Sequence, residues 1–274
     1  METFGSPPGE TTSPGVRPAV DRARAALVEK WAQGRRVERV AYLVAAVLFT
    51  SGLVHFGVLV TTGTTWEGPL SYRKAMTFGL SFGLTLATLA WATSFLAMRP
   101  RTRTLLLGAF TGVSVVEVAL ITMQVWRRVP SHFNFESGFD SVVSMGLALG
   151  GAVIIATVFG FTVTAWRATT ALSPSMLLAL RFGLTVLMGA LAVGAMMIAD
   201  GVRLARGGDP QLAYTTAGAL KPVHAVTMHA ILAVGGLAWS LRFTEWSERR
   251  RVMVIRAVIM VYTVLIAVVW AVFG

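Results

Sequence analysis

The chain contains no cysteine and few charged residues. Of its 274 residues, 14% are Asp, Glu, Lys or Arg, whereas 55% are hydrophobic. Without cysteine the protein cannot form disulfides, iron–sulfur clusters, thiolate zinc sites or c-type haem attachments, and it has no cysteine nucleophile. A composition as hydrophobic as this is also atypical of a soluble domain. It predicts a membrane protein whose chemistry uses His, Asp, Glu, Ser, Thr, Tyr or Met.

Apolar runs of roughly 20 residues, the length that an α-helix needs to cross the hydrocarbon core, recur along the chain. There are seven of them, at residues 40–62, 75–98, 104–126, 142–165, 177–199, 222–241 and 252–273. We therefore expect an all-α fold, a polytopic bundle of seven transmembrane helices within residues 37–274. The oligomeric state is not predicted.

The N-terminal 36 residues are polar and differ along their length. Residues 1–17 are rich in Gly, Pro, Ser and Thr, which predicts a disordered tail. Residues 18–36 combine apolar side chains at helical spacing with Lys and Arg. This pattern predicts a basic amphipathic juxtamembrane helix that lies on anionic lipids of the inner leaflet. The alternative is a solvated basic linker.

Basic residues are distributed unevenly over the two sides of the predicted bundle. With a cytoplasmic N-terminus, 17 of the 24 Lys and Arg fall on the inner side and the other seven on the outer side. The positive-inside rule then predicts a cytoplasmic N-terminus and an outside C-terminus. The same bias accounts for the net charge of +11. We therefore expect the lipid bilayer, and no nucleic acid, as the partner.

Several polar side chains are predicted to share one depth in the membrane. His55 lies seven residues before the outer end of the first span, and His229 lies seven residues after the outer start of the sixth. At about 1.5 Å per residue, both lie roughly 10 Å below the outer surface. Glu117 is slightly deeper, and Ser81 and Thr85 bracket this level. These residues predict an outward-facing pocket in which His55, Glu117 and His229 bind a divalent metal ion or carry protons.

The stretch from residue 117 to residue 140 leads from this pocket to its predicted mouth. Gln124 lies two helical turns after Glu117 and on the same face. Together with His224 it lies near the outer surface, where His132 and Asn134 of the following connector are also predicted to line the mouth. A histidine that caps its own turn is the alternative for His132.

Each of these polar groups also has a purely structural interpretation. Glu117 fits a neutral acid that is hydrogen-bonded inside the bundle, and His55 or His229 fits a hydrogen-bonded interior imidazole. His224 and His229 lie about 140° apart around a helix, so they cannot easily bind one ion together.

Two basic pairs and two glycine pairs have their own interpretations. Arg127 and Arg128 are predicted to anchor the helix at the interface; alternatively, they form a clamp for an anionic substrate with Arg73 and Lys74. The glycines recur four apart, which predicts close helix packing rather than a hydrolase motif. These pairs are Gly79 with Gly83 and Gly146 with Gly150.

A resemblance to known sequences rests on three segments, residues 124–134 (QVWRRVPSHFN), 72–81 (YRKAMTFGLS) and 224–229. They resemble a group of uncharacterised bacterial multi-pass membrane proteins, which implies a bacterial cytoplasmic membrane and no particular activity. Three hypotheses therefore remain open. The protein binds or moves a metal ion, proton or small polar solute; it is a redox protein with a single haem b held by His55 and His229; or it is a non-catalytic scaffold. No catalytic residue is predicted.

Overall fold

The fold is all-α and built around seven long apolar helices. The computed structural model describes residues 16–66, 68–168, 172–216 and 218–274. The helices in these ranges are α1 (Val16–Ala32), α2 (Arg36–Thr62), α3 (Arg73–Ser94), α4 (Pro100–Trp126), α5 (Gly138–Arg167), α6 (Pro174–Arg206), α7 (Pro210–Thr216), α8 (Lys221–Leu241) and α9 (Glu248–Phe273). All except α1 and α7 are long and apolar enough to cross a membrane. The predicted seven-span fold is confirmed, and the chain is a multi-pass membrane protein.

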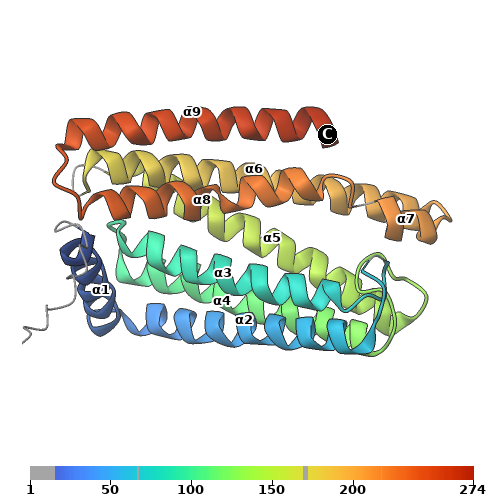
Figure 1. The fold of residues 1–274 in the computed structure, drawn as a ribbon. Coiled ribbons are helices and arrows are strands. Elements are labelled where there is room, and N and C mark those ends of the chain that lie inside the picture. Colours follow the sequence, from blue (N-terminus) through green and yellow to red (C-terminus); the bar gives the residue numbers. More distant parts are fainter. Residues whose placement is uncertain (1–15, 67, 169–171, 217) are drawn as a thin grey trace, which may run out of the picture.

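The spans form two groups that lie side by side (Figure 1). One group consists of α2, α3 and α4, and the other of α6, α8 and α9. Helix α5 runs obliquely between them and packs against α4 and α6. Helix α1 lies across one end of the bundle and α7 lies at the opposite end, so we refer to the α1 end and the α7 end. The orientation of these ends in a membrane stays a prediction.

Helix α1 occupies most of the segment for which a basic amphipathic helix was predicted. Its Arg22 Nη2 donates to the carbonyl oxygen of Phe243 over 2.8 Å, and its Trp31 ring lies 6.3 Å from that of Tyr42. These contacts join α1 to the segment after α8 and to α2. The tail predicted at residues 1–17 lies almost entirely outside the described residues.

Local signals set the ends of the spans. Pro100 and Pro174 start α4 and α6, because a fixed φ suits the first turn and the missing N–H is not needed there. The residue before a proline avoids the helical region, and Arg99 is accordingly extended, with ψ 138°. Helix α3 ends at Ser94 rather than at the predicted residue 98, because the backbone N–H groups of Phe95 and Leu96 donate to carbonyl oxygens three residues back and so close a tighter turn.

Glycines allow α2 and α3 to pack with their backbones in contact. A Cβ atom on Gly79 would lie 2.7 Å from Cα of Gly52, and one on Gly83 would lie 2.7 Å from the carbonyl oxygen of Ala45. No larger residue fits at this distance. The close packing predicted for Gly79 and Gly83 is confirmed.

A buried ion pair fastens α2, α3 and α4 together at the α1 end. Arg103 is 1% exposed and donates to Glu38 over 3.2 Å. It also donates to the carbonyl oxygens of Thr93 and Leu96, over 2.7 and 2.6 Å. Thr93 lies in the last turn of α3 and Leu96 in the turn that follows it, so Arg103 supplies donors where the helix ends. The sequence did not predict this role of Arg103, which in the structure joins three helices.

Helix α9 lies at the edge of the bundle. Ile255 is its only buried residue, and large apolar side chains such as Val261 and Val264 are exposed. The hydroxyl of Tyr262 donates to the carbonyl oxygen of Val226 over 2.8 Å and so ties α9 to α8. An exposed apolar surface of this kind suits contact with lipid.

Candidate functional site

His55 is held between two helices by both ring nitrogens. The indole N–H of Trp126 donates to Nε2 over 3.0 Å, so Nδ1 carries the proton and donates to the carbonyl oxygen of Ser51 over 2.7 Å. The ring is 5% exposed. A metal or haem ligand needs a free ring nitrogen, and His55 has none in this arrangement. The structure therefore favours the structural interpretation of His55.

Glu117 is buried against α5. Its carboxyl group occupies the space left by Gly150, where a Cβ atom would collide with Oε1. Glu117 is 4% exposed and makes no hydrogen bond or ion pair among the described residues. Gly150, predicted to allow close packing, therefore makes room for a buried acid. Glu117 therefore lies inside the bundle, as both of its interpretations require, and its role in a ligand or proton pocket stays a prediction.

The two histidines of α8 have different surroundings. Nδ1 of His224 donates to the carbonyl oxygen of Ala190 on α6 over 2.7 Å, so this ring fastens α8 to α6. His229 is partly buried and makes no side-chain hydrogen bond within the described part of the chain. Ser81 and Thr85 of α3 are likewise partly buried without such bonds there.

The structure gives no support to the predicted metal site. In the described ranges, which include His55, Glu117 and His229, no group of three His, Asp or Glu side chains lies close enough to hold a metal ion. His55 is bound by α2 and α4, whereas Glu117 packs on α5. These side chains were predicted to share one depth in the membrane, but they do not lie next to one another in the bundle.

A polar network near the α7 end holds the start of α5 against the end of α4. Asp140 accepts from Gln124 over 2.9 Å, from Arg127 over 2.6 Å and from Ser137 over 2.6 Å. Arg127 also donates to Gln124. Gln124 is fully buried and Asp140 is 5% exposed. The network assigns Gln124 and Arg127 to helix fastening and removes Arg127 from the predicted anion clamp.

The connector between α4 and α5 folds over the α7 end around Asn134. The backbone N–H of Asn134 donates to the hydroxyl of Ser144 over 3.2 Å, and this hydroxyl donates back to the Asn134 carbonyl over 3.0 Å. The Asn134 side chain accepts from the backbone of Glu136 and donates to that of Pro130. Asn134 is fully buried, so it shapes the connector rather than lining a mouth.

His132 points from this connector towards α3. Its Nδ1 lies 3.1 Å from the hydroxyl oxygen of Ser131, and its ring centroid lies 5.9 Å from that of Phe78. Burial lowers the pKa of His132 well below its ordinary value, and the positive charge of Lys74 adds to this effect. The ring is therefore neutral at neutral pH. Nε2 makes no hydrogen bond among the described residues and remains able to contact a ligand.

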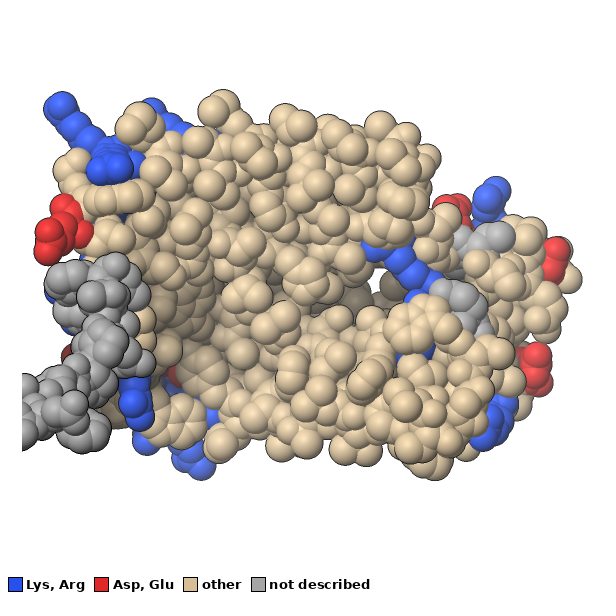
Figure 2. Space-filling view, in the orientation of Figure 1, with Lys and Arg blue, Asp and Glu red and all other residues tan. Residues whose placement is uncertain are grey.

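Lys74 lies among other positive charges. The charges of Lys221, from α8, and of Arg73 act on its partly buried ammonium group. No acidic side chain pairs with Lys74 in the part of the chain that the structure describes. Figure 2 shows an opening between the two helix groups near the α7 end, with Lys or Arg side chains at its edge. We call Lys74, Lys221 and His132 the cationic cluster.

Only part of this site was predicted from the sequence. His132 was predicted to line the mouth and Lys74 was part of the alternative anion clamp, but Lys221 was not placed beside them. The direction of the spans could have indicated it. Successive spans alternate in direction, so α3 and α8 both begin at the same end of the bundle, and the basic residues in their first turns lie at the same level.

Comparisons with protein-family models, curated proteins and solved structures found no match to this chain. The resemblance of residues 124–134 to uncharacterised bacterial membrane proteins therefore stays a prediction.

Proposed function

We propose that this membrane protein binds a small anion, of the carboxylate or phosphate class, in the opening at the α7 end. The observation that carries this proposal is Lys74, a partly buried ammonium group with cationic neighbours and no acidic partner among the described residues. A charge withdrawn from water without a counter-charge costs several kcal/mol. A bound anion would offset that cost.

The other members of the cationic cluster suit the same ligand. Lys221 is exposed and adds a second ammonium group from the opposite helix group. His132, kept neutral by its surroundings, offers Nε2 as a hydrogen-bonding group without adding a third charge. Lysine binds phosphate and carboxylate as a point charge, which requires no rigid geometry. The cluster therefore favours a small anion over a metal ion.

The test compares Lys74→Met with a matched cation at the same end. Arg203 is a suitable control because its side chain is 78% exposed and lies beside Asp200. Thermal unfolding of detergent-solubilised protein is measured with inorganic phosphate or with acetate, at an ionic strength held constant with sodium chloride. We expect one of these anions to raise the melting temperature of the wild-type protein and of Arg203→Met, but not that of Lys74→Met.

A second readout separates binding from a structural role. Without phosphate or acetate, Lys74→Met should melt at a higher temperature than the wild-type protein, because an uncompensated buried charge has been removed. A lower melting temperature would show that Lys74 has an acidic or carbonyl partner. An anion effect that survives in Lys74→Met would also overturn the proposal.

We also propose that the α1 end faces the cytoplasm of a bacterial cell, with α1 on the anionic inner leaflet. The distribution of Lys and Arg supports this orientation. The opening then faces the exterior. Because the chain lacks cysteine, single cysteines at Glu136 and Arg249 report the two sides without background. In intact cells a membrane-impermeant maleimide should label only the former.

A further inference from the structure

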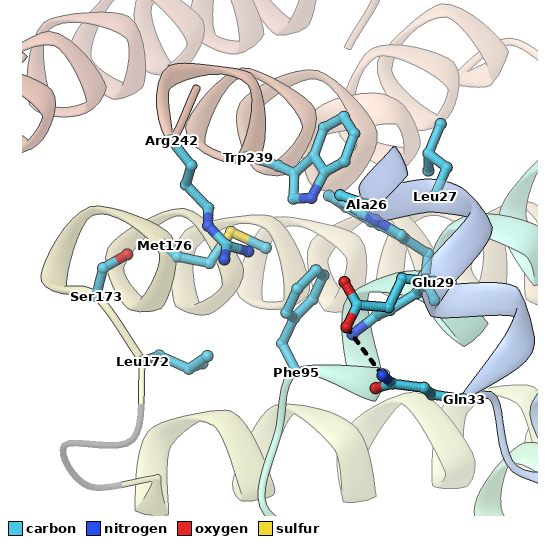
Figure 3. A pocket seen from close by; sticks show the side chains of 12 residues that line it. Ala26, Leu27, Glu29, Gln33, Phe95, Leu172, Ser173, Met176, Trp239 and Arg242 are labelled. Atoms are coloured by element: carbon cyan, nitrogen blue, oxygen red, sulfur yellow. Dashed lines mark hydrogen bonds between the residues drawn. The ribbon is translucent and has the colours of Figure 1, made fainter. Parts of the chain in front are cut away.

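A cavity of about 380 Å³ lies at the α1 end, far from the cationic cluster (Figure 3). Helices α1, α3, α6 and α8 contribute to its walls. Its lining combines apolar and cationic side chains, among them Trp91, Phe95, Met176, Trp239, Lys30 and Arg242. The cavity thus has an aromatic interior and two basic groups, and its chemistry differs from that of the site proposed above.

The cavity lies where the spans end. Helix α3 ends at Ser94, α8 ends at Leu241, and α6 begins at Pro174. Tryptophans near helix ends are typical of the boundary between hydrocarbon and headgroups. Trp91 and Trp239 form such a pair, with ring centroids 6.2 Å apart and planes inclined by 83°. We therefore expect the cavity, whose wall includes residues of α1, to lie at headgroup depth.

Two cations converge inside the cavity. Lys30 Nζ lies 3.8 Å from the centroid of the Phe95 ring, and the guanidinium carbon of Arg242 lies 6.0 Å from the same centroid. Burial lowers the pKa of Lys30; Glu38 opposes this effect and Arg242 adds to it. These surroundings disfavour the Lys30 charge, and an anion placed between the two cations would relieve the repulsion.

Among the described residues that line the cavity, only Glu29 is acidic. Its Oε1 accepts a hydrogen bond of 2.8 Å from Nε2 of Gln33, which directly follows the last residue of α1 (Figure 3). Glu29 makes no ion pair with Lys30 or Arg242. The two cations therefore keep their capacity to bind an external anion.

We propose that this cavity binds the headgroup of an anionic phospholipid, with its phosphate between Lys30 and Arg242. The start of the acyl chains lies against Trp91, Met176 and Trp239. A free phosphate would leave this aromatic and thioether surface unused, whereas a lipid uses both parts. The volume suits a headgroup and its glycerol rather than a whole lipid, so the remaining acyl chains extend into the bilayer.

The test uses full-length protein, delipidated in dodecyl maltoside. Retention of phosphatidylglycerol and of phosphatidylcholine is followed by native mass spectrometry for the wild-type protein and two double variants. Lys30→Met/Arg242→Met removes both cavity cations. Arg24→Met/Arg249→Met removes two exposed cations from the same end, and neither lines the cavity. We expect the first double variant to lose about tenfold or more in affinity for phosphatidylglycerol, and the second to match the wild-type protein.

Several results would overturn the proposal. An equal loss in both double variants would indicate diffuse attraction to a basic surface. Equal retention of phosphatidylcholine would remove the role of the net negative charge. Displacement of phosphatidylglycerol by an equal concentration of glycerol 3-phosphate would identify a soluble anion as the ligand.

Glu29→Gln supplies a second measurement in case the first double variant does not fold. Removing the acid from the wall should tighten phosphatidylglycerol binding, and unchanged or weaker binding would count against the site. None of these outcomes depends on Lys74, because the two sites lie at opposite ends of the bundle.

Discussion

The indole N–H of Trp126 donates to Nε2 of His55 over 3.0 Å and so joins α4 to α2. We expect Trp126→Phe to lower the free energy of unfolding by about 1 kcal/mol, because Nε2 of a buried ring loses its donor. A double-mutant cycle with His55→Leu, measured by unfolding in mixed micelles, should give a coupling energy of similar size. Additive effects would show that this bond contributes nothing to stability.

Loss of Arg103 should destabilise the protein strongly. Arg103→Met removes the buried counter-charge of the Glu38 carboxylate, which keeps only the half-exposed Arg35, and it removes the side-chain donor from the carbonyl oxygens of Thr93 and Leu96. We expect a cost of roughly 3 kcal/mol or more. Arg101→Met is the matched control, because Arg101 is an exposed cation in the same turn and should change stability by less than about 0.5 kcal/mol. Equal effects of the two substitutions would contradict the role of Arg103 in joining α2, α3 and α4.

The two adjacent glycines of α5 should respond differently to alanine. In Gly150→Ala the new methyl group collides with the Glu117 carboxyl group, whereas in Gly151→Ala the nearest atom is 3.9 Å away, on Ile198. We expect the first substitution to cost about 1 to 3 kcal/mol and the second to be neutral or stabilising. Adding Glu117→Ala to Gly150→Ala should recover most of the loss. Thermal unfolding of the three variants and the wild-type protein tests this, and a failed recovery would place the clash elsewhere.

Stability should fall on acidification, in part because of His132. The folded protein keeps this ring neutral, whereas the unfolded chain takes up a proton near pH 6.5. Below that pH the unfolded state binds more protons, so stability decreases by up to about 1.4 kcal/mol per pH unit for this group. His132→Asn should flatten the melting temperature between pH 7.5 and pH 5. Lys74→Met should weaken the dependence as well, since its charge contributes to the low pKa. A profile unchanged in His132→Asn would assign the pH effect to other groups.

Most of the fold was predictable, because long apolar runs have few other uses. Hydrophobicity located all seven spans, and glycine spacing correctly indicated that α3 packs closely against another helix, without identifying that helix as α2. The ends were less predictable: helices extend beyond the hydrocarbon, and Arg103 turned inward although its sequence neighbours are exposed.

The candidate site was harder to predict, because depth along the bundle does not determine direction around it. His55 and Glu117 lie on neighbouring helices at similar depth, but one faces Trp126 and the other faces Gly150. Rotation of a span by one residue changes direction by 100°, and the order of helices around the bundle is not encoded in hydrophobicity. The proximity of Lys74 and Lys221 therefore required the three-dimensional arrangement.

The position of α9 at the edge of the bundle affects the order in which the spans dissociate when the protein is denatured. Since Ile255 is the only buried residue of α9, this span contributes less to the interior than the six preceding spans do. Rising amounts of a harsh detergent should therefore detach the last span before the remainder loses its shape, and the protein would pass through a six-span intermediate.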